Sequence, residues 1–318
     1  MKALVSAIVA NLNGAHHLEV CLPTLVDQSY DSLEIIVVDN GSTDESEKIV
    51  RRWGVEWLPL GCNLGLAGAL NQGAKVSKGE FLLFLNNDMR FPPNFVQEMV
   101  KAIEMEADIF AVDALQYDWE GKVKRHLAVF LLKRPGKYLH TITVVPGLYT
   151  EQKDVDNQTI VFQACAAAML VRKDMFLSLG GFDARMPAGY EDTDICWRAW
   201  LRGWKTIFVP QAFCWHRVGA SSFSPEGARV RFKGTLIGRL IFATKLLPIN
   251  YLLMTLTYSI AGFFRDFKNK YKLLLRLQVL KEYFSIFPTL IQERKLIYQN
   301  AQITPSEQLN QLLQLEKL

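Results

Sequence analysis

Three acidic side chains crowd into the first turn of a short predicted helix. Residues 189–204 read "GYEDTDICWRAWLRGW" and place Glu191, Asp192 and Asp194 together, with no basic residue beside them. The helix dipole favours acidic residues at this end by roughly 0.3–1 kcal/mol each, so one or two of them need no function. Three carboxylates this close repel one another, an arrangement that tunes an acid or base or receives a cation. The stretch is therefore either a helix start or a reaction centre.

Polar side chains also end the apolar runs of the first half of the chain. Asn11 follows the run at residues 4–10, and Asp39 ends the run "LEIIVVD". The run "EFLLFLNND" ends in Asn86, Asn87 and Asp88. Parallel strands bring such ends to one edge of a sheet, where the ligands of open α/β sheets bind.

The elements that must position these residues alternate between strands and helices. Helical patterns separate four apolar runs, which predict strands at residues 4–10, 33–39, 55–60 and 80–88. The last run is apolar until its end, which is typical of a strand buried on both faces. This order favours an α/β fold with a mostly parallel sheet flanked by helices.

Other stretches carry weaker signals. Ser42 and Glu45 are spaced as a capping box and predict the start of the second helix. Residues 113–158 are mixed in character, and we expect an irregular insertion there that shapes an acceptor site. Residues 161–173 predict a strand. The acidic helix follows and should end at Gly203, before a strand that begins "KTIFVP".

Six motifs in this order resemble the family 2 glycosyltransferases, particularly their rhamnosyltransferase-like branch. The motifs are "VANLNG", "EIIVVDNGSTDES", "CNLGLAGALNQG", "LLFLNND", "GGFDARMPAGYEDTDICWRAWLRGW" and "VPQAFCWH". They lie between residues 4 and 222, about two thirds of the chain. The resemblance implies a Rossmann-like GT-A fold, a nucleotide-diphosphate sugar donor, a divalent cation (Mn²⁺ or Mg²⁺) and inversion at the anomeric carbon. It places the catalytic domain in residues 1–228.

The resemblance also implies roles for individual residues. Asp39 matches the acid that contacts the nucleotide base and ribose, and "NND" takes the place of the family's DxD motif, with Asn86 where the first acid stands. Leu12 stands where many relatives have a tyrosine. Asp192 matches the catalytic base, and His216 matches a histidine that joins the metal site. Donor contacts are implied at Asn11, Asp39, Asn63, Gly65, Asn71, Asn87 and Asp88.

Transfer from such a donor makes demands that these residue types meet. A divalent cation stabilises the charge of a departing diphosphate, and Asp88 would supply an oxygen ligand while His216 supplies a nitrogen, which favours Mn²⁺. The simpler role of Asp88 is to cap the end of its strand, and the simpler reading of His216 is a hydrogen-bonded, partly buried histidine. Asp192 would take the proton of the acceptor hydroxyl, a step typically worth 10²–10⁴ in rate. Glu191 would hold Asp192 or contact the acceptor, and Asp194 would cap the helix.

The last third of the chain differs from the rest. Residues 229–318 hold 14 Lys or Arg against 5 Asp or Glu, and residues 246–264 form an uncharged run that contains Pro248 and Asn250. We expect a helical extension that lies on an anionic membrane surface rather than crossing it. The alternatives are a spanning helix, packing on the catalytic domain and a homodimer interface.

Composition limits the other possibilities. The chain has 318 residues, 50% of them hydrophobic, and five scattered cysteines without a CxxC pair. This favours neither a disulfide framework nor a zinc site, and it suits a cytoplasmic protein on the inner face of the cell membrane. The expected acceptor is lipid-linked or a polysaccharide. A nucleotidyltransferase and a non-catalytic sugar-binding or scaffold protein remain alternatives, while nucleic acid is disfavoured because the basic residues lie in an apolar helical segment.

Overall fold

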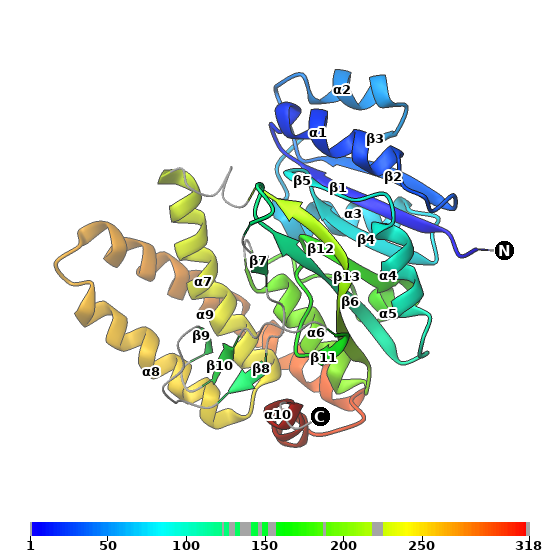
Figure 1. The fold of residues 1–318 in the computed structure, drawn as a ribbon. Coiled ribbons are helices and arrows are strands. Elements are labelled where there is room, and N and C mark those ends of the chain that lie inside the picture. The colour runs from blue at the N-terminus through cyan, green and yellow to red at the C-terminus, as the bar shows by residue number, and fades with distance from the viewer. Residues whose placement is uncertain are drawn as a thin grey trace.

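A ten-stranded sheet forms the centre of the computed structural model, which describes residues 2–122, 124–126, 131–133, 141–145, 148–151, 157–186, 189–217 and 225–315. The strand order is β11-β13-β6-β12-β4-β1-β2-β3, with β5 beside β13 and β7 beside β6 (Figure 1). The strands are β1 (Val5–Asn11), β2 (Leu33–Asp39), β3 (Glu56–Pro59), β4 (Phe81–Asn86), β5 (Met89–Arg90), β6 (Ile109–Tyr117), β7 (Lys124–His126), β11 (Thr159–Val161), β12 (Ala168–Arg172) and β13 (Lys205–His216).

The sheet is mostly parallel in its first half, as predicted. Strands β1, β2, β3 and β4 run parallel to one another, and β13 runs parallel to β6, while β12 is antiparallel to both β4 and β6. Asn11 stands opposite Asp39 in the β1–β2 register, and Ala10 stands opposite Asn86 in the β1–β4 register. The polar ends of three strands therefore meet at one edge.

Helices cover both faces of the sheet. One face packs against α1 (Ala15–Val26), α2 (Ser46–Trp53) and α4 (Phe95–Ile103). The other packs against α3 (Gly65–Val76), α5 (Lys173–Ser178) and α6 (Glu191–Leu201). All of β4 from Phe81 to Leu85 is buried, as expected for a strand covered on both faces.

Two predictions for the middle of the chain are wrong. The stretch expected to be irregular, residues 113–158, begins inside β6, a buried strand, and its described part also contains β7 and a small sheet of β8 (Leu131–Lys133), β10 (Leu148–Glu151) and β9 (Thr141–Val145). Residues 123, 127–130, 134–140, 146–147 and 152–156 of this stretch lie outside the described residues. The strand expected at residues 161–173 is two short strands, β11 and β12. Sheet pairing decides both cases. Strand β6 lies between β13 and β12, and its polar residues are buried there, whereas β11 pairs with β13 and β12 pairs with β6 and β4.

Four helices complete the chain: α7 (Pro225–Leu246), α8 (Ile249–Arg265), α9 (Lys270–Gln299) and α10 (Pro305–Gln314). They share a hydrophobic cluster with α6 that includes the fully buried Trp197 and Tyr283. Pro248 caps α8, so the uncharged run of residues 246–264 is divided between two helices. Among the residues described here, no helix is both long and apolar enough to cross a membrane. A division into domains at residues 228 and 229 stays a proposal.

Candidate functional site

Asn11 and Asp39 form a buried polar cluster at the carboxyl ends of β1 and β2. Asn11 Nδ2 donates to Asp39 Oδ1 at 3.2 Å, and the Ser42 backbone N–H donates to Asp39 Oδ2 at 3.0 Å. The Ser42 hydroxyl also donates to Asp39, so the capping box predicted for Ser42 and Glu45 is wrong. Asp39 is held in one orientation by three donors.

Asn87 joins this cluster to the end of β4. Its Nδ2 donates to Asn11 Oδ1 at 2.7 Å. Gly14 lies directly against this pair, and a β-carbon at this position would collide with both amide groups. The absence of a side chain at residue 14 thus lets the two asparagines meet.

A second polar group, missed in the sequence, shapes the turn before α3. Asn40 Nδ2 donates to Asn63 Oδ1 at 2.9 Å, and Asn40 Oδ1 accepts the Leu64 backbone N–H at 2.7 Å. The predicted Gly65 donates its own N–H to Asn63 and has φ of +74°, a conformation that favours glycine. Asn40 therefore connects the end of β2 to the glycine-rich turn, and its position next to Asp39 was the available signal.

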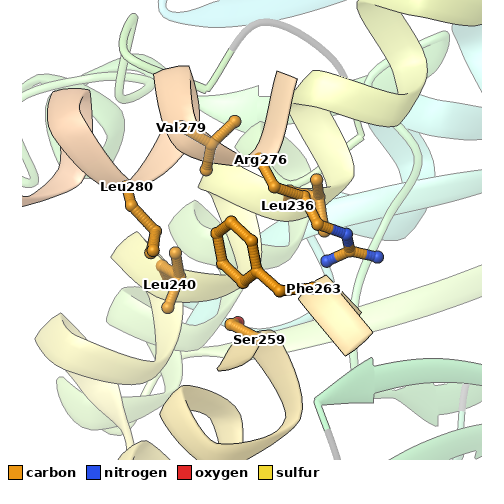
Figure 2. Close-up of a pocket in the computed structure, with 7 residues that line it drawn as sticks. All are labelled: Leu236, Leu240, Ser259, Phe263, Arg276, Val279 and Leu280. Carbon is orange, nitrogen blue, oxygen red and sulfur yellow. The ribbon is translucent and has the colours of Figure 1, made fainter. Parts of the chain in front are cut away.

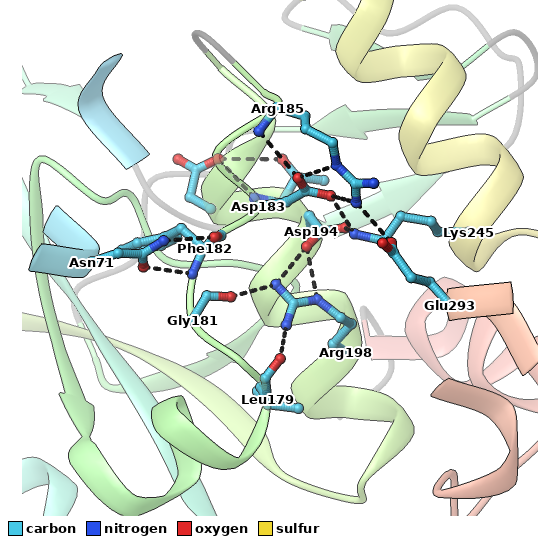
Figure 3. A network of polar contacts seen from close by, with 12 residues as sticks. Asn71, Leu179, Gly181, Phe182, Asp183, Arg185, Asp194, Arg198, Lys245 and Glu293 are labelled. Atoms are coloured by element: carbon cyan, nitrogen blue, oxygen red, sulfur yellow. Dashed lines mark hydrogen bonds and ion pairs between the residues drawn. The ribbon is translucent and has the colours of Figure 1, made fainter. Parts of the chain in front are cut away.

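Asn71 lies six residues further into α3 than Gly65 and has a different set of contacts. Its amide accepts the Phe182 backbone N–H at 2.9 Å and donates to the Phe182 carbonyl at 2.8 Å (Figure 3). Both ends of the amide thus hold the "GGFD" turn that precedes α6. Its donor-contact role stays a prediction, whereas its positioning of this turn is visible.

Asp88 and His216 meet across the β5–β13 pair, as the resemblance implied. His216 stands opposite Met89 in that register, and its Nε2 lies 3.2 Å from Asp88 Oδ1. His216 Nδ1 lies 2.8 Å from Gln116 Oε1, and a ring that donates from Nδ1 to this oxygen can offer the Nε2 lone pair to a cation beside the carboxylate. Two electron-rich atoms at this distance suit a shared proton or a cation.

These side chains fit a divalent cation whose remaining ligands are oxygens of a bound diphosphate. An oxygen ligand, an imidazole nitrogen and an outer hydrogen bond to the imidazole are the parts that such a site uses. Among the described residues, no group of three or more His, Cys, Asp or Glu side chains could hold a metal ion. A cation between Asp88 and His216 would thus need further oxygens from a ligand or water. Gln116, buried in β6, was missed because it lies inside the stretch read as irregular.

His17 and Arg217 also lie near Asp88. Burial is the main cause that lowers the pKa of His17, the neighbouring His16 lowers it further, and the charge of Asp88 opposes the shift. Arg217 donates its backbone N–H to the Asp88 carbonyl at 2.9 Å, and its guanidinium lies 4.4 Å from the centre of the Trp119 ring. The Arg217 backbone therefore lies directly beside Asp88, while its guanidinium stacks on Trp119.

Glu191 turns back onto the chain before α6. Its Oε2 accepts the backbone N–H groups of Gly189 at 2.7 Å and of Tyr190 at 3.0 Å. Burial, followed by repulsion from Asp192, raises the pKa of Glu191 to about 7. Glu191 therefore holds the loop that leads into the helix.

Asp192 is partly exposed, whereas Glu191, Thr193 and Asp194 are buried. Its Oδ1 accepts the Thr193 backbone N–H at 2.7 Å, and the Thr193 hydroxyl donates to Gln163 Oε1 at 2.7 Å. The Thr193 N–H thus holds one carboxylate oxygen of Asp192, while the side chain stays partly exposed.

The loop between β11 and β12, which contains Cys165, links the two halves of the site. Burial is the largest cause that raises the pKa of this thiol, the charges of Asp192 and Asp113 raise it further, and a contact with Gln116 lowers it. On either side of Cys165, Gln163 accepts the Thr193 hydroxyl at 2.7 Å, and the Ala167 carbonyl accepts the Asn86 backbone N–H at 3.0 Å. The structure brings the predicted base and the predicted cation ligands to the same part of the sheet edge.

Asp194 takes part in a buried ion-pair network (Figure 3). The predicted cap is wrong, because no side chain caps α6 and Asp194 instead contacts Arg198 Nε at 2.7 Å and Lys245 Nζ at 2.9 Å. Lys245, from α7, also reaches Asp183 Oδ2 at 2.7 Å. Burial opposes ionisation of Asp183, but hydrogen bonds from Arg185 and the charge of Lys245 hold its pKa below the ordinary value. The network ties α6 to the C-terminal helices.

The raised pKa of Glu191 predicts a pH dependence of stability. Between about pH 4.5 and pH 7 the folded state retains a proton that the unfolded state releases, so the free energy of unfolding should fall as pH rises through this range. Glu191→Gln removes this titration. The difference in the free energy of unfolding between variant and wild type should therefore change by up to about 3 kcal/mol between pH 4.5 and pH 7. Urea unfolding at several pH values measures it. A difference that stays constant from pH 4.5 to pH 7 would refute the raised pKa.

Comparisons with known proteins agree with this geometry. A family model described as "Glycosyl transferase family 2" matches residues 6–176, more than half of the chain. "Glycosyltransferase GlyG" of Streptococcus pneumoniae serotype 4 is 31% identical over 37% of this chain and 41% of the relative. "N-acetylglucosaminyl-diphospho-decaprenol L-rhamnosyltransferase" of Mycobacterium tuberculosis is 24% identical over 70% of this chain and 78% of the relative. Matches to the first four curated relatives cover 32% to 41% of their lengths.

Two solved structures share the fold. "Mannosyltransferase PcManGT from Pyrobaculum calidifontis in complex with GDP-Man and Mn2+" has a TM-score of 0.57 and 18% identity, covering 93% of this chain and 85% of that chain. "Crystal structure of S. aureus TarS 1-349" has a TM-score of 0.55 and 16% identity, and the match covers 99% of this chain and 90% of that chain. The likeness extends over the C-terminal helices as well as the sheet.

Proposed function

Because the chain belongs to glycosyl transferase family 2 and has a GT-A fold, we propose that it moves a sugar from a nucleotide-diphosphate donor to a hydroxyl of an acceptor, with inversion at the anomeric carbon. The observation that carries this proposal is the meeting of three groups at one sheet edge. These are the Asn11–Asp39 cluster, the Asp88–His216 pair and the partly exposed Asp192. Each meets one demand of the transfer.

The donor would lie along the carboxyl ends of β1, β2 and β4. Asp39 is the acid assigned to the nucleotide, and its three hydrogen-bond donors hold it ready without a change of conformation. Asn63 and Gly65 shape the turn that would close over the donor, and Asn87 connects the nucleotide end to the diphosphate end. Preformed polar groups of this kind lower the cost of ordering the site when a ligand binds.

Asp88 and His216 would hold the divalent cation, which supplies charge stabilisation for the diphosphate when bound. Gln116 would accept the Nδ1 proton and so favour the tautomer that presents Nε2 to the cation. A solved neighbour was crystallised with GDP-Man and Mn²⁺, which supports Mn²⁺ as the first cation to test.

Asp192 would act as the general base. In one displacement, a bond forms between the acceptor oxygen and the anomeric carbon, the bond from that carbon to the diphosphate oxygen breaks, and the acceptor proton passes to Asp192. Attack from the face opposite the leaving group inverts the configuration. The Thr193 N–H contact keeps one carboxylate oxygen in place during the transfer.

The acceptor we propose is lipid-linked, with a polysaccharide as the alternative. A relative matched over 70% of this chain carries a decaprenol-linked acceptor in its name. An acceptor of this kind places the reaction at the cytoplasmic face of a membrane.

Two other functions are less well supported. A nucleotidyltransferase would need basic residues in the loop after β1, where residues 11–14 contain none. A non-catalytic sugar-binding protein would not need Asp39, Asp88 and Asp192 together.

We expect Asp88→Ala to abolish most of the Mn²⁺-dependent binding of nucleoside diphosphates, because it removes the carboxylate ligand. His216→Ala should weaken binding less, and Gln116→Ala, which keeps both ligands but removes the contact to the imidazole, by roughly 10–100-fold. Calorimetric titration of UDP, GDP and dTDP, with Mn²⁺ and with excess chelator, measures these effects. Asp27→Ala removes an exposed carboxylate elsewhere and should bind like wild type. Tight binding by Asp88→Ala, or by wild type in chelator, would contradict the proposed cation site.

A further inference from the structure

The outer face of α8 is apolar and uncharged. Helix α8 contains no charged residue before Arg265, its last. Large side chains on its outer face are exposed, namely Ile249, Leu253, Met254, Tyr258, Ile260 and Phe264. A helix face that meets water normally carries polar and charged residues. A continuous apolar face of this kind marks an interaction surface.

The charges around this face have one sign. Across residues 249–299, all of which the structure describes, the three acids are each partly buried and paired: Asp266 with Arg276, Glu282 with Lys233, and Glu293 with Arg185. The exposed charged side chains of the same segment are all basic: Arg265, Lys268, Lys270, Lys272, Lys281 and Lys295. The apolar face is therefore bordered by exposed positive charge that no exposed acid offsets.

The inner side of this segment is already occupied. Phe263, Arg276, Val279 and Leu280 pack against α7 and leave a cavity of only about 10 Å³, about what one water molecule needs (Figure 2). Figure 1 shows α8 and α9 extending from the body of the molecule to a loop, residues 266–269, at the far left. Phe264 and Phe267, at this loop, are 80% and 72% exposed. The available surface is thus the outer face and the tip.

We propose that residues 249–281 form a membrane-docking hairpin that rests on a bilayer containing anionic lipids. Phe264, Phe267 and the outer face of α8 enter the acyl boundary, and the basic side chains contact the headgroups. The combination of an apolar face with flanking Lys and Arg is the pattern of helices that lie in the membrane interface. Docking here would hold the sheet edge beside a lipid-linked acceptor. This consequence rests on the proposed function, whereas the membrane binding itself does not.

A second copy of the chain fits this surface less well. A twofold contact through the tip would bring together Arg265, Lys268 and Lys270 of both copies, charges of the same sign with no exposed acid to pair with. Anionic headgroups supply the missing opposite charge.

The test is co-sedimentation of the full chain with vesicles of phosphatidylcholine alone or mixed in equal parts with phosphatidylglycerol. Wild type should bind the anionic vesicles and release them at high salt. Lys268→Glu with Lys270→Glu should weaken binding by at least about 25-fold, since each basic residue contributes about fivefold. Phe264→Ser with Phe267→Ser should weaken it by about tenfold or more. Lys101→Glu with Met105→Ser makes matched changes at exposed positions at the end of α4 and should change nothing.

Thermal unfolding confirms that each variant is folded. Absence of wild-type binding to the anionic vesicles, or equal binding by the hairpin and control variants, would overturn the proposal. A wild-type dimer that becomes a monomer in Phe264→Ser with Phe267→Ser, without vesicle binding, would assign the surface to a second copy instead. The vesicle assay contains no sugar nucleotide, so a failure here is separate from a failure of the proposed transfer.

Discussion

Replacing Asp192 with asparagine is expected to lower the rate of sugar transfer by roughly 10²–10⁴, the range that general base catalysis contributes. Asparagine keeps the size of the side chain and can still accept the Thr193 N–H, but it cannot take the acceptor proton. Donor and cation binding should remain nearly unchanged, because Asp39 and Asp88 supply those contacts. Initial rates with saturating donor, together with calorimetric donor affinity, measure the two effects separately.

Asp174→Asn is a matched control for this change. Asp174 is an exposed acid in the first turn of α5, so its replacement tests the loss of a carboxylate at a helix start without touching the site. We expect the control to keep wild-type activity. If Asp192→Asn turned over at a rate close to wild type, Asp192 would not be the base and Glu191 would be the next candidate.

Replacing Lys245 with methionine is expected to destabilise the protein by about 3–5 kcal/mol. Lys245 is 3% exposed and pairs with both Asp183 and Asp194, so its loss leaves these two buried carboxylates with only Arg185 and Arg198 to offset their charge. The free energy of unfolding in urea measures the effect. Lys233→Met is the control on the same helix, because Lys233 and Glu282 form a partly exposed surface pair that is worth about 0–1 kcal/mol.

A further variant separates charge from packing. Combining Lys245→Met with Asp183→Asn restores the charge balance of the network, because Asp194 keeps Arg198 and Arg185 keeps Glu293, and should recover much of the lost stability. Equal small losses for the Lys245 and Lys233 variants would show that the network does not hold α6 on the C-terminal helices. Because Asp194 lies two residues from Asp192, Lys245→Met alone should also lower activity, since α6 would no longer be held in place.

The edge of the sheet could be predicted from the sequence because strong local signals coincide there. Mainly apolar runs specify β1, β2 and β4, and their polar ends fall at the same edge once the strands are parallel. Gly203, with φ of +75°, ends α6 where its sequence position indicated. The pairing of Asp88 with His216 depended on the family resemblance, since the two are far apart in the chain.

What could not be predicted depends on contacts between distant segments. Asp113 and Gln116 interrupt the apolar pattern of β6, yet both are buried through contacts that only the folded sheet provides. Ser42 has the spacing of a helix cap but bonds Asp39, because the end of β2 is close enough to compete. Asp194 resembles a helix cap until Lys245, 51 residues later in the chain, reaches it. Local spacing contains none of this information.

The most direct measurement of the proposed transfer is the release of nucleoside diphosphate from a panel of nucleotide sugars, with the freed or transferred sugar observed by NMR at early times. With Mn²⁺ we expect the wild type to turn over a member of the panel and to give a product of inverted anomeric configuration. Excess chelator and Asp88→Ala should abolish most of this release, and Asp192→Asn should slow transfer. Release from no donor, retention of configuration, or turnover that these changes leave intact would contradict the function proposed for this sheet edge.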